Sequence, residues 1–318
     1  MSMWLSKLAP HLQQFEETKK ALGYTYRRQS ESLHSFDKFC FENFPEATTI
    51  TKEITFAWLK NKKSNEKSST TNKKLSLLRE LSKFIKLTDS ECFIPDKRFR
   101  LKEQQFICRI ITDEEINKLL HTIHRIENTA KSPYKVQTCK TYFTLLYCTG
   151  LRSSEAINLN RAHINFDTGE IQIVESKCHS NRKIVLSNKL LILLKQYDSY
   201  LSPTREPFFS LNGVTRPSIG TLADYLKKAW KLSGLTSTCV RQHDFRHTFI
   251  TKRILEWQKN HMNLSEKIQN LMNFVGHRHI DDTLYYFRLV PELSCYFNLT
   301  DFDEIIPNFG DNDENRIY

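Results

Sequence analysis

The hydrophobic period of residues 163–187 differs from that of the rest of the chain. The segments HINF, EIQIVE and RKIVLS alternate apolar and polar residues, and the turn sequences DTG and SKCHSN separate them. Such alternation is typical of half-buried strands joined by short turns. Elsewhere the apolar residues follow a helical period, and only 8 of the 318 residues are Gly, which disfavours turn-rich β folds. The sequence therefore predicts a mainly α protein with one small three-stranded antiparallel sheet.

The charge balance and the cysteines restrict the class of protein. Lys and Arg (47) exceed Asp and Glu (36), a net charge of +11. This indicates a polyanionic partner, nucleic acid before others, with a solvated basic surface as the alternative. The 8 Cys have no CxxC spacing, which argues against a zinc ribbon. Neither a signal peptide nor an apolar run of the ~18 residues needed to span a membrane is found, so we expect reduced thiols in a bacterial cytoplasm, associated with the nucleoid.

Residues 1–95 have the pattern of a compact helical domain. The apolar spacing predicts four short helices, of which the first ends at Gly23, the second (Ser30–Phe44) ends before Pro45, and the third covers Thr51–Lys60. Residues 1–110 hold 21 Lys and Arg against 13 Asp and Glu, a net of +8. The polar loop before the fourth helix suits phosphate contacts, or it is a flexible solubilising loop. Its candidate DNA-binding residues are Lys62, Lys63, Lys67, Lys73 and Lys74.

A second domain is expected over residues 111–298, after a basic linker at 96–110. Its first helix should begin at Thr112, because TDEE reads as a capping box. The last residues, 299–318, carry six acidic residues against Arg316 alone. This acidic tail is expected to dock on a basic patch of its own chain or of a neighbour, or else to be disordered.

The chemistry-bearing residues are concentrated between residues 240 and 289, in VRQHDFRHTF, VGHRHI and DDTLYYFRL. A tyrosine is a poor nucleophile at neutral pH, since its phenol titrates near ~10. A protein that uses one must surround it with cations and proton acceptors. TGLRSSEAINL, at residues 149–159, supplies one more cation, Arg152. The residues concerned are Tyr286, Arg246, His243, His277 and Arg152.

Each of these residues also fits a plainer role. Arg152 alone could pair with Glu155 on a helix surface, and the tyrosines could be core aromatics. His243 and His247 have the spacing of a helical zinc site, but the glutamate of the metalloprotease motif is missing. The plainer roles are disfavoured because the motifs occur together and in order.

Together these motifs resemble those of the tyrosine site-specific recombinases, the phage integrase family. TGLRSSEAINL resembles the first conserved box, with Arg152 as its catalytic arginine and Glu155 in support. HDFRHTF resembles the second box, His-X-X-Arg. VGHRHIDDTLYYF resembles the Gly-His segment, in which the nucleophile follows the His by nine residues, and this selects Tyr286 over Tyr285. The lysine of the family's β-hairpin corresponds to Lys177.

Two departures from the family pattern concern the hairpin and a longer spacing. Ser176 and Cys178 flank Lys177 where the family usually has glycines, and Lys183 on the same hairpin is the alternative. The segment Ile250–Phe274 is longer than the usual spacing between the second box and Gly-His. We expect it to extend a helix or add a loop without moving a catalytic side chain.

The resemblance implies a fold and a reaction. The fold is a helical DNA-clamping (SAM-like) domain followed by a tyrosine-recombinase catalytic domain. The nucleophile would form a 3′-phosphotyrosine and release a 5′-hydroxyl, while two arginines and a histidine hold the phosphate oxygens. Neither metal nor cofactor is implied. The expected roles are Tyr286 as nucleophile, Arg152, Arg246 and His277 as phosphate ligands, Lys177 as general acid, His243 as proton acceptor, and Arg182 and Lys183 as DNA contacts.

The resemblance also implies an assembly. We expect a tetramer on double-stranded DNA with a specific core site, exchanging strands through a Holliday junction, with an accessory DNA-bending or directionality factor as an optional partner. Residues 291–302 would pack on a neighbouring protomer. We expect no arm-binding domain of the kind that many integrases have, and therefore a simple core site, for integration or excision of a mobile element or a related rearrangement. The alternatives are a type IB topoisomerase-like enzyme and a catalytically silent DNA-binding regulator.

Overall fold

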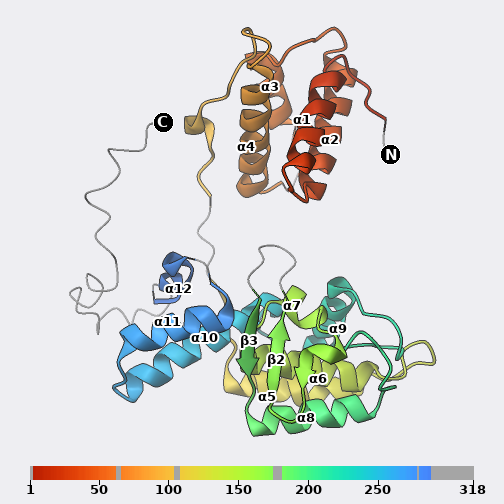
Figure 1. The fold of residues 1–318 in the computed structure, drawn as a ribbon, viewed down its shortest axis with the longest axis vertical. Helices are drawn as coiled ribbons and strands as arrows, with labels where there is room; N and C mark the ends of the chain where they lie inside the picture. Colours follow the sequence, from red (N-terminus) through yellow and green to blue (C-terminus); the bar gives the residue numbers. More distant parts are fainter. Residues whose placement is uncertain (1–2, 62–65, 104–107, 175–180, 278, 288–318) are drawn as a thin grey trace. The chain divides into compact units, whose positions relative to one another are not determined.

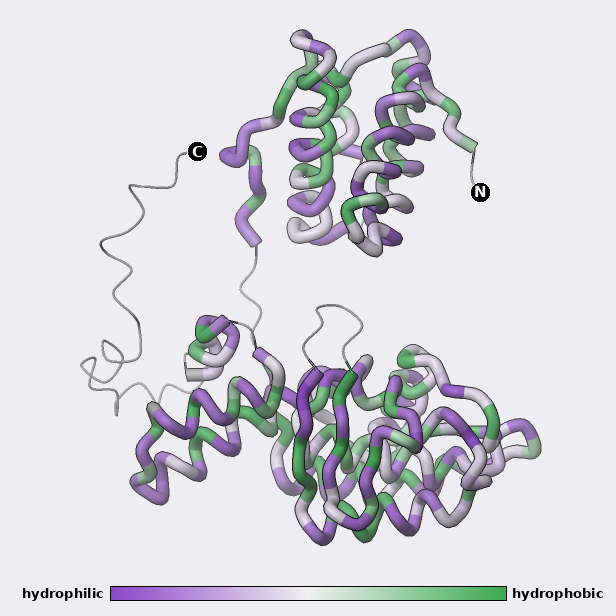
Figure 2. Tube along the Cα trace, viewed as in Figure 1, coloured by the Kyte–Doolittle hydropathy of each residue, from purple (hydrophilic) through white to green (hydrophobic). Residues whose placement is uncertain are grey.

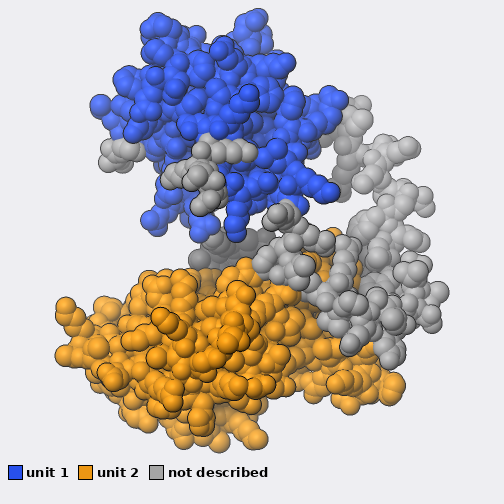
Figure 3. Space-filling model, turned by 180° about the vertical axis from the view of Figure 1, so that it is seen from behind, with its two compact units in different colours: residues 1–106 blue, residues 107–318 orange. Residues whose placement is uncertain are grey.

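The computed structural model describes residues 3–61, 66–103, 108–174, 181–277 and 279–287. The chain forms two compact units, Met1–Phe106 and Ile107–Tyr318 (Figure 3). The predicted fold class, mainly helical with a three-stranded antiparallel sheet, is confirmed. The division at a 96–110 linker stays a prediction.

The first unit is built from four helices (Figure 1). Their core is rich in aromatic side chains. Helices adjacent in sequence pack on one another, and the first also packs on the fourth. Phe36 and Trp58 meet edge to face in the core, with ring centroids 5.5 Å apart. A single 3-10 turn, η1 (Lys97–Phe99), follows. The helices are α1 (Ala9–Ala21), α2 (Arg27–Asn43), α3 (Lys52–Lys60) and α4 (Ser68–Ile85).

Local sequence explains where these helices begin and end. After α1, Gly23 has φ +83°, its N–H donates to the Lys20 carbonyl, and the Tyr24 N–H donates to the Lys19 carbonyl. This is a Schellman motif, which a residue with a Cβ adopts only with strain. The Thr51 hydroxyl accepts the Ile54 N–H at the start of α3. The second helix begins three residues earlier than the sequence predicts, at Arg27.

The second unit surrounds a central helix, α6, that packs against α5, α8, α9 and α10. Hydrophobic and hydrophilic residues alternate along most of its helices (Figure 2). Within the described residues, no helix combines the length and the apolarity that crossing a membrane requires. The helices are α5 (Asp113–Thr122), α6 (Lys135–Thr149), α7 (Ser153–Ile157), α8 (Asn188–Ser199), α9 (Ile219–Leu232), α10 (Gln242–Lys259), α11 (Leu264–Val275) and α12 (Ile280–Phe287), with the 3-10 turns η2 (Ile123–Arg125) and η3 (Arg161–His163).

The sheet has the order β1-β2-β3, and both pairings are antiparallel. Its strands are β1 (Ile164–Asn165), β2 (Glu170–Ile173) and β3 (Arg182–Val185). Ile171 lies opposite both Ile164 and Ile184, and all three side chains are buried in the core of the unit. Alternation therefore does place one face of the sheet inward, as the sequence predicts.

The predicted capping box at the start of α5 is present. The Thr112 hydroxyl accepts the Glu115 N–H, and the Glu115 carboxylate accepts the Thr112 N–H. The long segment Ile250–Phe274 forms the second half of α10, a short loop and most of α11. These two helices lie side by side in the blue part of Figure 1. They share a small apolar cluster with α12.

Candidate active site

A pocket of about 430 Å³ gathers residues from all three predicted motifs. Arg152 precedes α7, His243 and Arg246 belong to α10, His277 follows α11, and the other four lining residues belong to α12. Chain segments more than a hundred residues apart thus meet at one place. Lys177 lies outside the described residues, as do Lys62, Lys63 and the segment 291–302. The lining residues are Arg152, His243, Arg246, His277, Asp281, Asp282, Tyr285 and Tyr286.

Arg246 is the cation held most firmly in this pocket. Its side chain is 1% exposed, and its two terminal nitrogens donate to the carbonyls of Gly150 (2.9 Å) and Val275 (2.7 Å). These carbonyls lie at the C-terminal ends of α6 and α11, where helices carry negative partial charge. Burial, helped by the charge of Arg152, lowers the pKa of Arg246 to about 10. The guanidinium therefore remains protonated at neutral pH.

Arg152 lies at the start of α7 and is tied to two elements. One terminal nitrogen donates to Glu155 Oε1 (2.7 Å), and the other donates to the Gly276 carbonyl (2.7 Å). The backbone N–H of Arg152 donates to Glu155 Oε2 (2.9 Å). The pairing with Glu155 is thus real, yet it does not remove Arg152 from the pocket, since one third of its side chain is exposed there.

Arg182, whose contact with DNA stays a prediction, lies against the same carboxylate. Its terminal nitrogens donate to Glu155 Oε1 (3.1 Å) and Oε2 (2.8 Å), and its Nε donates to the Phe274 carbonyl (2.9 Å). The Arg182 side chain is only 12% exposed. Gly276 has φ +69°, and a Cβ there would approach Arg182 Nη1 to 2.7 Å. Arg182 is therefore a link between β3, α7 and the end of α11.

His277 follows the turn at the end of α11. The backbone N–H of His277 donates to the Met272 carbonyl, and the ring Nδ1 lies 2.8 Å from the buried Thr283 hydroxyl. Burial, then the charges of Arg246 and Arg152, lower the pKa of His277 to about 3. The ring is neutral at pH 7. When Nδ1 accepts the threonine proton, Nε2 carries the ring hydrogen, as a donor to a phosphate oxygen requires.

Tyr286 is 3% exposed, and burial raises its pKa to about 12 while the charge of Arg246 opposes that rise. The phenol is therefore protonated at neutral pH. Its hydroxyl lies 3.1 Å from Nδ1 of His247.

The contact between His247 and Tyr286 is not predicted from the sequence. There, the spacing of His247 indicates only an alternative zinc ligand, and His243 is the expected proton acceptor. The signal available was the i, i+4 position of His247 relative to His243, which could not specify which ring faces the tyrosine.

The zinc alternative is not supported by side-chain clustering. In the part of the chain that the structure describes, no three His, Cys, Asp or Glu side chains gather as metal ligands would. His243 and His247 meet edge to face, with ring centroids 4.6 Å apart. Burial, followed by the charge of Arg246, lowers the pKa of His243 as well.

The described lysines predicted to contact DNA occupy different settings. Lys67 and Lys73 are exposed at the start of α4. Lys74 is mostly buried: it pairs with Glu66 at 2.8 Å and lies over the Trp58 ring. Lys183 is exposed and pairs with Glu170. DNA contact by these residues stays a prediction, and the ion pair of Lys74 with Glu66 favours a role in fixing the start of α4.

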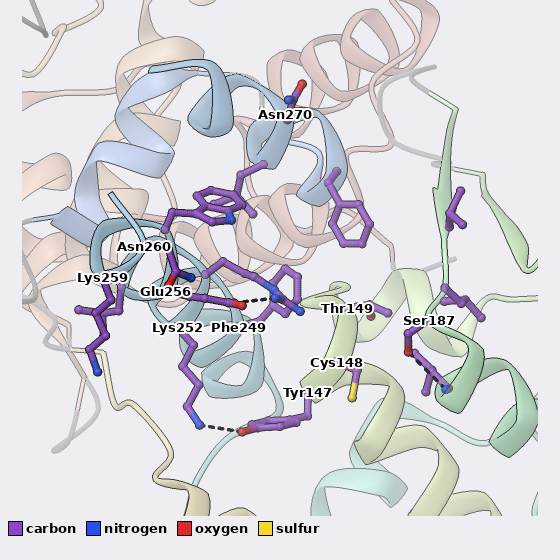
Figure 4. Close-up of a pocket in the computed structure, with 18 of the residues that line it drawn as sticks. Tyr147, Cys148, Thr149, Ser187, Phe249, Lys252, Glu256, Lys259, Asn260 and Asn270 are labelled. Carbon is purple, nitrogen blue, oxygen red and sulfur yellow. Dashed lines mark hydrogen bonds and ion pairs between the residues drawn. The ribbon is translucent and has the colours of Figure 1, made fainter. Parts of the chain in front are cut away.

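A larger groove of about 1060 Å³ lies between α10, α11, the end of α6 and the start of α8 (Figure 4). Its lining mixes apolar, basic and acidic side chains, and the Lys252 ammonium points to the Tyr147 hydroxyl at 2.7 Å. Lys252 also pairs with Asp113, and Arg253 pairs with Glu256. The apolar members include Leu190, Phe249, Trp257, Leu271 and Phe274, and the basic ones are Lys252, Arg253 and Lys259.

Solved structures share this fold. The chain superposes on the XerH site-specific recombinase with a TM-score of 0.64 and 18% identity, over 83% of this chain and 76% of that one. For the Tn1549 transposon integrase the TM-score is 0.66, with 15% identity over 93% and 99% of the two chains. For a lambda integrase the TM-score is 0.64, with 16% identity over 86% and 96%. The fold is thus that of tyrosine recombinases.

The sequence comparisons agree. The pattern that defines the phage integrase family matches residues 109–292, more than half of the chain. The protein y4rE of Sinorhizobium fredii, provisionally named an integrase/recombinase, is 22% identical over 90% of this chain and 93% of its own length. A tyrosine recombinase of Thermosipho africanus is 25% identical over 63% and 62%. The chain belongs to the phage integrase family, and the predicted class of enzyme, a tyrosine recombinase, is confirmed.

Proposed function

We propose that this recombinase cuts and rejoins DNA at a specific core site through a covalent bond to Tyr286. The observation that carries the proposal is the convergence of Arg152, Arg246, His277 and Tyr286 on one pocket. The phenol lies beside a fixed, buried guanidinium, which is where a phosphate under attack needs positive charge. A buried tyrosine in the apolar core would need no such surroundings.

In the proposed reaction, the Tyr286 oxygen attacks the scissile phosphorus. The bond from phosphorus to the 5′-oxygen breaks, giving a 3′-phosphotyrosine and a 5′-hydroxyl. Arg152 and Arg246 hold the non-bridging oxygens by charge-assisted hydrogen bonds, and His277 donates another. Lys177 supplies the proton for the leaving oxygen, with Lys183 as the alternative. Attack by the 5′-hydroxyl of another strand reverses the sequence and rejoins DNA.

The supporting residues in this scheme preserve the geometry of the two arginines. Glu155 receives hydrogen bonds from both Arg152 and Arg182, so one carboxylate fixes the entry to α7 relative to β3. Carbonyls at two helix ends fix Arg246. Preorganised cations lose little freedom when charge grows on the phosphate in the transition state.

We further propose that the enzyme acts as a DNA-bound tetramer, in which residues 291–302 of one protomer occupy the groove of the next. A lambda integrase has been solved as a tetramer on a Holliday junction. The apolar lining of the groove and its exposed Lys259 complement this segment and the residues after it, which carry Leu293, Tyr296 and Phe297 and then several carboxylates. The first unit would clamp the core site, with Lys67 and Lys73 as phosphate contacts. The biological role would be movement of a mobile element or a related rearrangement.

Capture of covalently attached DNA tests the proposed chemistry. Wild type, Tyr286→Phe and the matched control Tyr285→Phe would be expressed in cells that carry the native element, lysed in denaturant and purified, and the attached DNA sequenced. We expect DNA with a shared sequence at its 3′ ends on wild type and Tyr285→Phe, and none on Tyr286→Phe. Adducts on all three proteins would exclude Tyr286 as the nucleophile. DNA ends without a shared sequence would favour a topoisomerase-like enzyme.

A further inference from the structure

We propose that His247 is a catalytic residue that accepts the phenol proton of Tyr286, in place of His243. The inference rests on the proposed function, because it takes Tyr286 as the nucleophile. The geometric basis is the 3.1 Å separation between His247 Nδ1 and the Tyr286 hydroxyl oxygen. This is within the distance that a general base needs before any substrate binds.

The position of His247 on α10 makes the contact specific. His247 is the residue after Arg246, so its side chain leaves the helix in a different direction from that of the phosphate-facing arginine. It is 6% exposed, and the Tyr286 and Tyr285 rings both lie near its imidazole. α10 and α12 are in contact, so the pair connects two packed helices. A buried, closely packed pair has little freedom to exchange partners.

The protonation states at neutral pH suit the transfer. Burial, then His243, lower the pKa of His247 to about 4, and burial raises the pKa of Tyr286 to about 12. The pair therefore starts as neutral imidazole and intact phenol. A ring that carries its hydrogen on Nε2 presents a lone pair on Nδ1 to the phenol. The charged and titratable groups around His247 are His243, Asp244, Arg241 and Arg246 from its own helix and cap, and Tyr285 and Tyr286 from α12.

Bonds and protons balance in the proposed step. The phenol O–H bond breaks as the oxygen–phosphorus bond forms, and the proton passes to Nδ1 of His247. The bond from phosphorus to the 5′-oxygen breaks, and that oxygen takes a proton from the general acid. On rejoining, the imidazolium of His247 returns its proton to the phenol oxygen as the phosphotyrosine bond breaks. No oxidant, metal or additional reactant takes part.

The decisive experiment measures single-turnover cleavage of a core-site duplex from pH 7 to 9.5. The proteins are wild type, His247→Asn, His243→Asn and Tyr286→Phe. We expect a nearly flat profile for wild type. His247→Asn should be slower by about 100-fold at pH 7, the lower range for a lost general base, and should gain nearly tenfold per pH unit as phenolate becomes available. His243→Asn should be slower with a flat profile.

The His247→Asn side chain has an amide oxygen that can accept a hydrogen bond but is not basic, so this variant separates positioning from proton transfer. A wild-type rate and profile for His247→Asn would overturn the proposal. So would a rising profile in His243→Asn together with a flat one in His247→Asn. Cleavage by Tyr286→Phe would instead defeat the proposed function itself. Melting temperature and core-site binding show whether each variant is folded.

Two further measurements isolate the step. A duplex with sulfur in place of the bridging 5′-oxygen needs no leaving-group proton, so the defect of His247→Asn should persist on it; restoration of the wild-type rate would assign His247 to the acid side. The second needs no DNA. Nitrogen-15 shifts of the His247 ring should show hydrogen on Nε2 and an acceptor at Nδ1 that changes in Tyr286→Phe. Hydrogen on Nδ1 would contradict the proposed tautomer.

Discussion

The Arg182 and Glu155 side chains form a buried ion pair, with Nη2 of the arginine 2.8 Å from Oε2 of the carboxylate. The same carboxylate binds Arg152, which lines the candidate active site. β3 is therefore connected to the pocket by two ion pairs, Arg182 with Glu155 and Glu155 with Arg152. A change in that strand can reposition Arg152 without touching DNA.

Arg182→Ala should impair both stability and cleavage. Removal of one partner of a buried ion pair costs about 3 kcal/mol, and Arg152 loses the second support of its carboxylate. We expect a lower melting temperature and cleavage slowed at least tenfold. Arg205→Ala is the matched control, because Arg205 forms a similarly buried ion pair with Asp198 (2.7 Å) that does not line the pocket. Equal effects of the two substitutions on cleavage would show that Arg182 has no special positioning role.

Gly276→Ala tests the same link from the other side. A Cβ at this position would come within 2.7 Å of Arg182 Nη1, in addition to the backbone strain at φ +69°. Gly234 has the same φ, and a Cβ there would meet no atom within 4 Å, so Gly234→Ala carries the strain, roughly 1–2 kcal/mol, alone. Cleavage rates and melting temperatures of both variants would be compared. We expect only Gly276→Ala to lose cleavage; similar cleavage by both would argue against a steric effect at Arg182.

Stability should fall as the pH is lowered from 6.5 towards 4. Burial lowers the pKa of His247 to about 4 and of His277 to about 3, from 6.5 for an ordinary histidine. In this window the unfolded chain binds protons at these histidines and the folded chain does not, so protonation favours unfolding. Above pH 6.5 these histidines are neutral in both the folded and the unfolded chain, so they no longer favour unfolding. Melting temperatures at pH 7.5 and 5 should therefore differ less in His247→Asn/His277→Asn than in wild type, and an equal difference would contradict these pKa shifts.

Lys259→Glu should weaken the proposed tetramer. The substitution reverses a charge in the groove of Figure 4, where an acidic and apolar segment of a neighbour is proposed to bind. We expect normal binding to a duplex with one core site and reduced assembly on paired sites, measured by gel mobility and light scattering. Lys189→Glu, at an exposed position on α8 that does not line the groove, is the control. Normal assembly of Lys259→Glu would remove Lys259 from that interface.

The sequence by itself determined the class of protein and identified several of the residues that line the pocket. The period-two segment predicted the sheet, and helix signals such as Gly23 and the Thr112 capping box predicted ends that the structure contains. Spacing also identified Arg152, Arg246 and Tyr286, which line one pocket. These features are local or lie in short motifs, so they can be read along the chain.

Only the tertiary structure decided how those side chains are partnered. That Arg182 reaches Glu155 depends on where the fold places β3 relative to α7. That His247 rather than His243 lies at the Tyr286 hydroxyl depends on the packing of α10 against α12. These contacts join residues 27 and 39 positions apart. No local propensity encodes them, because the rotation and depth of each packed element select one partner from several of the same type.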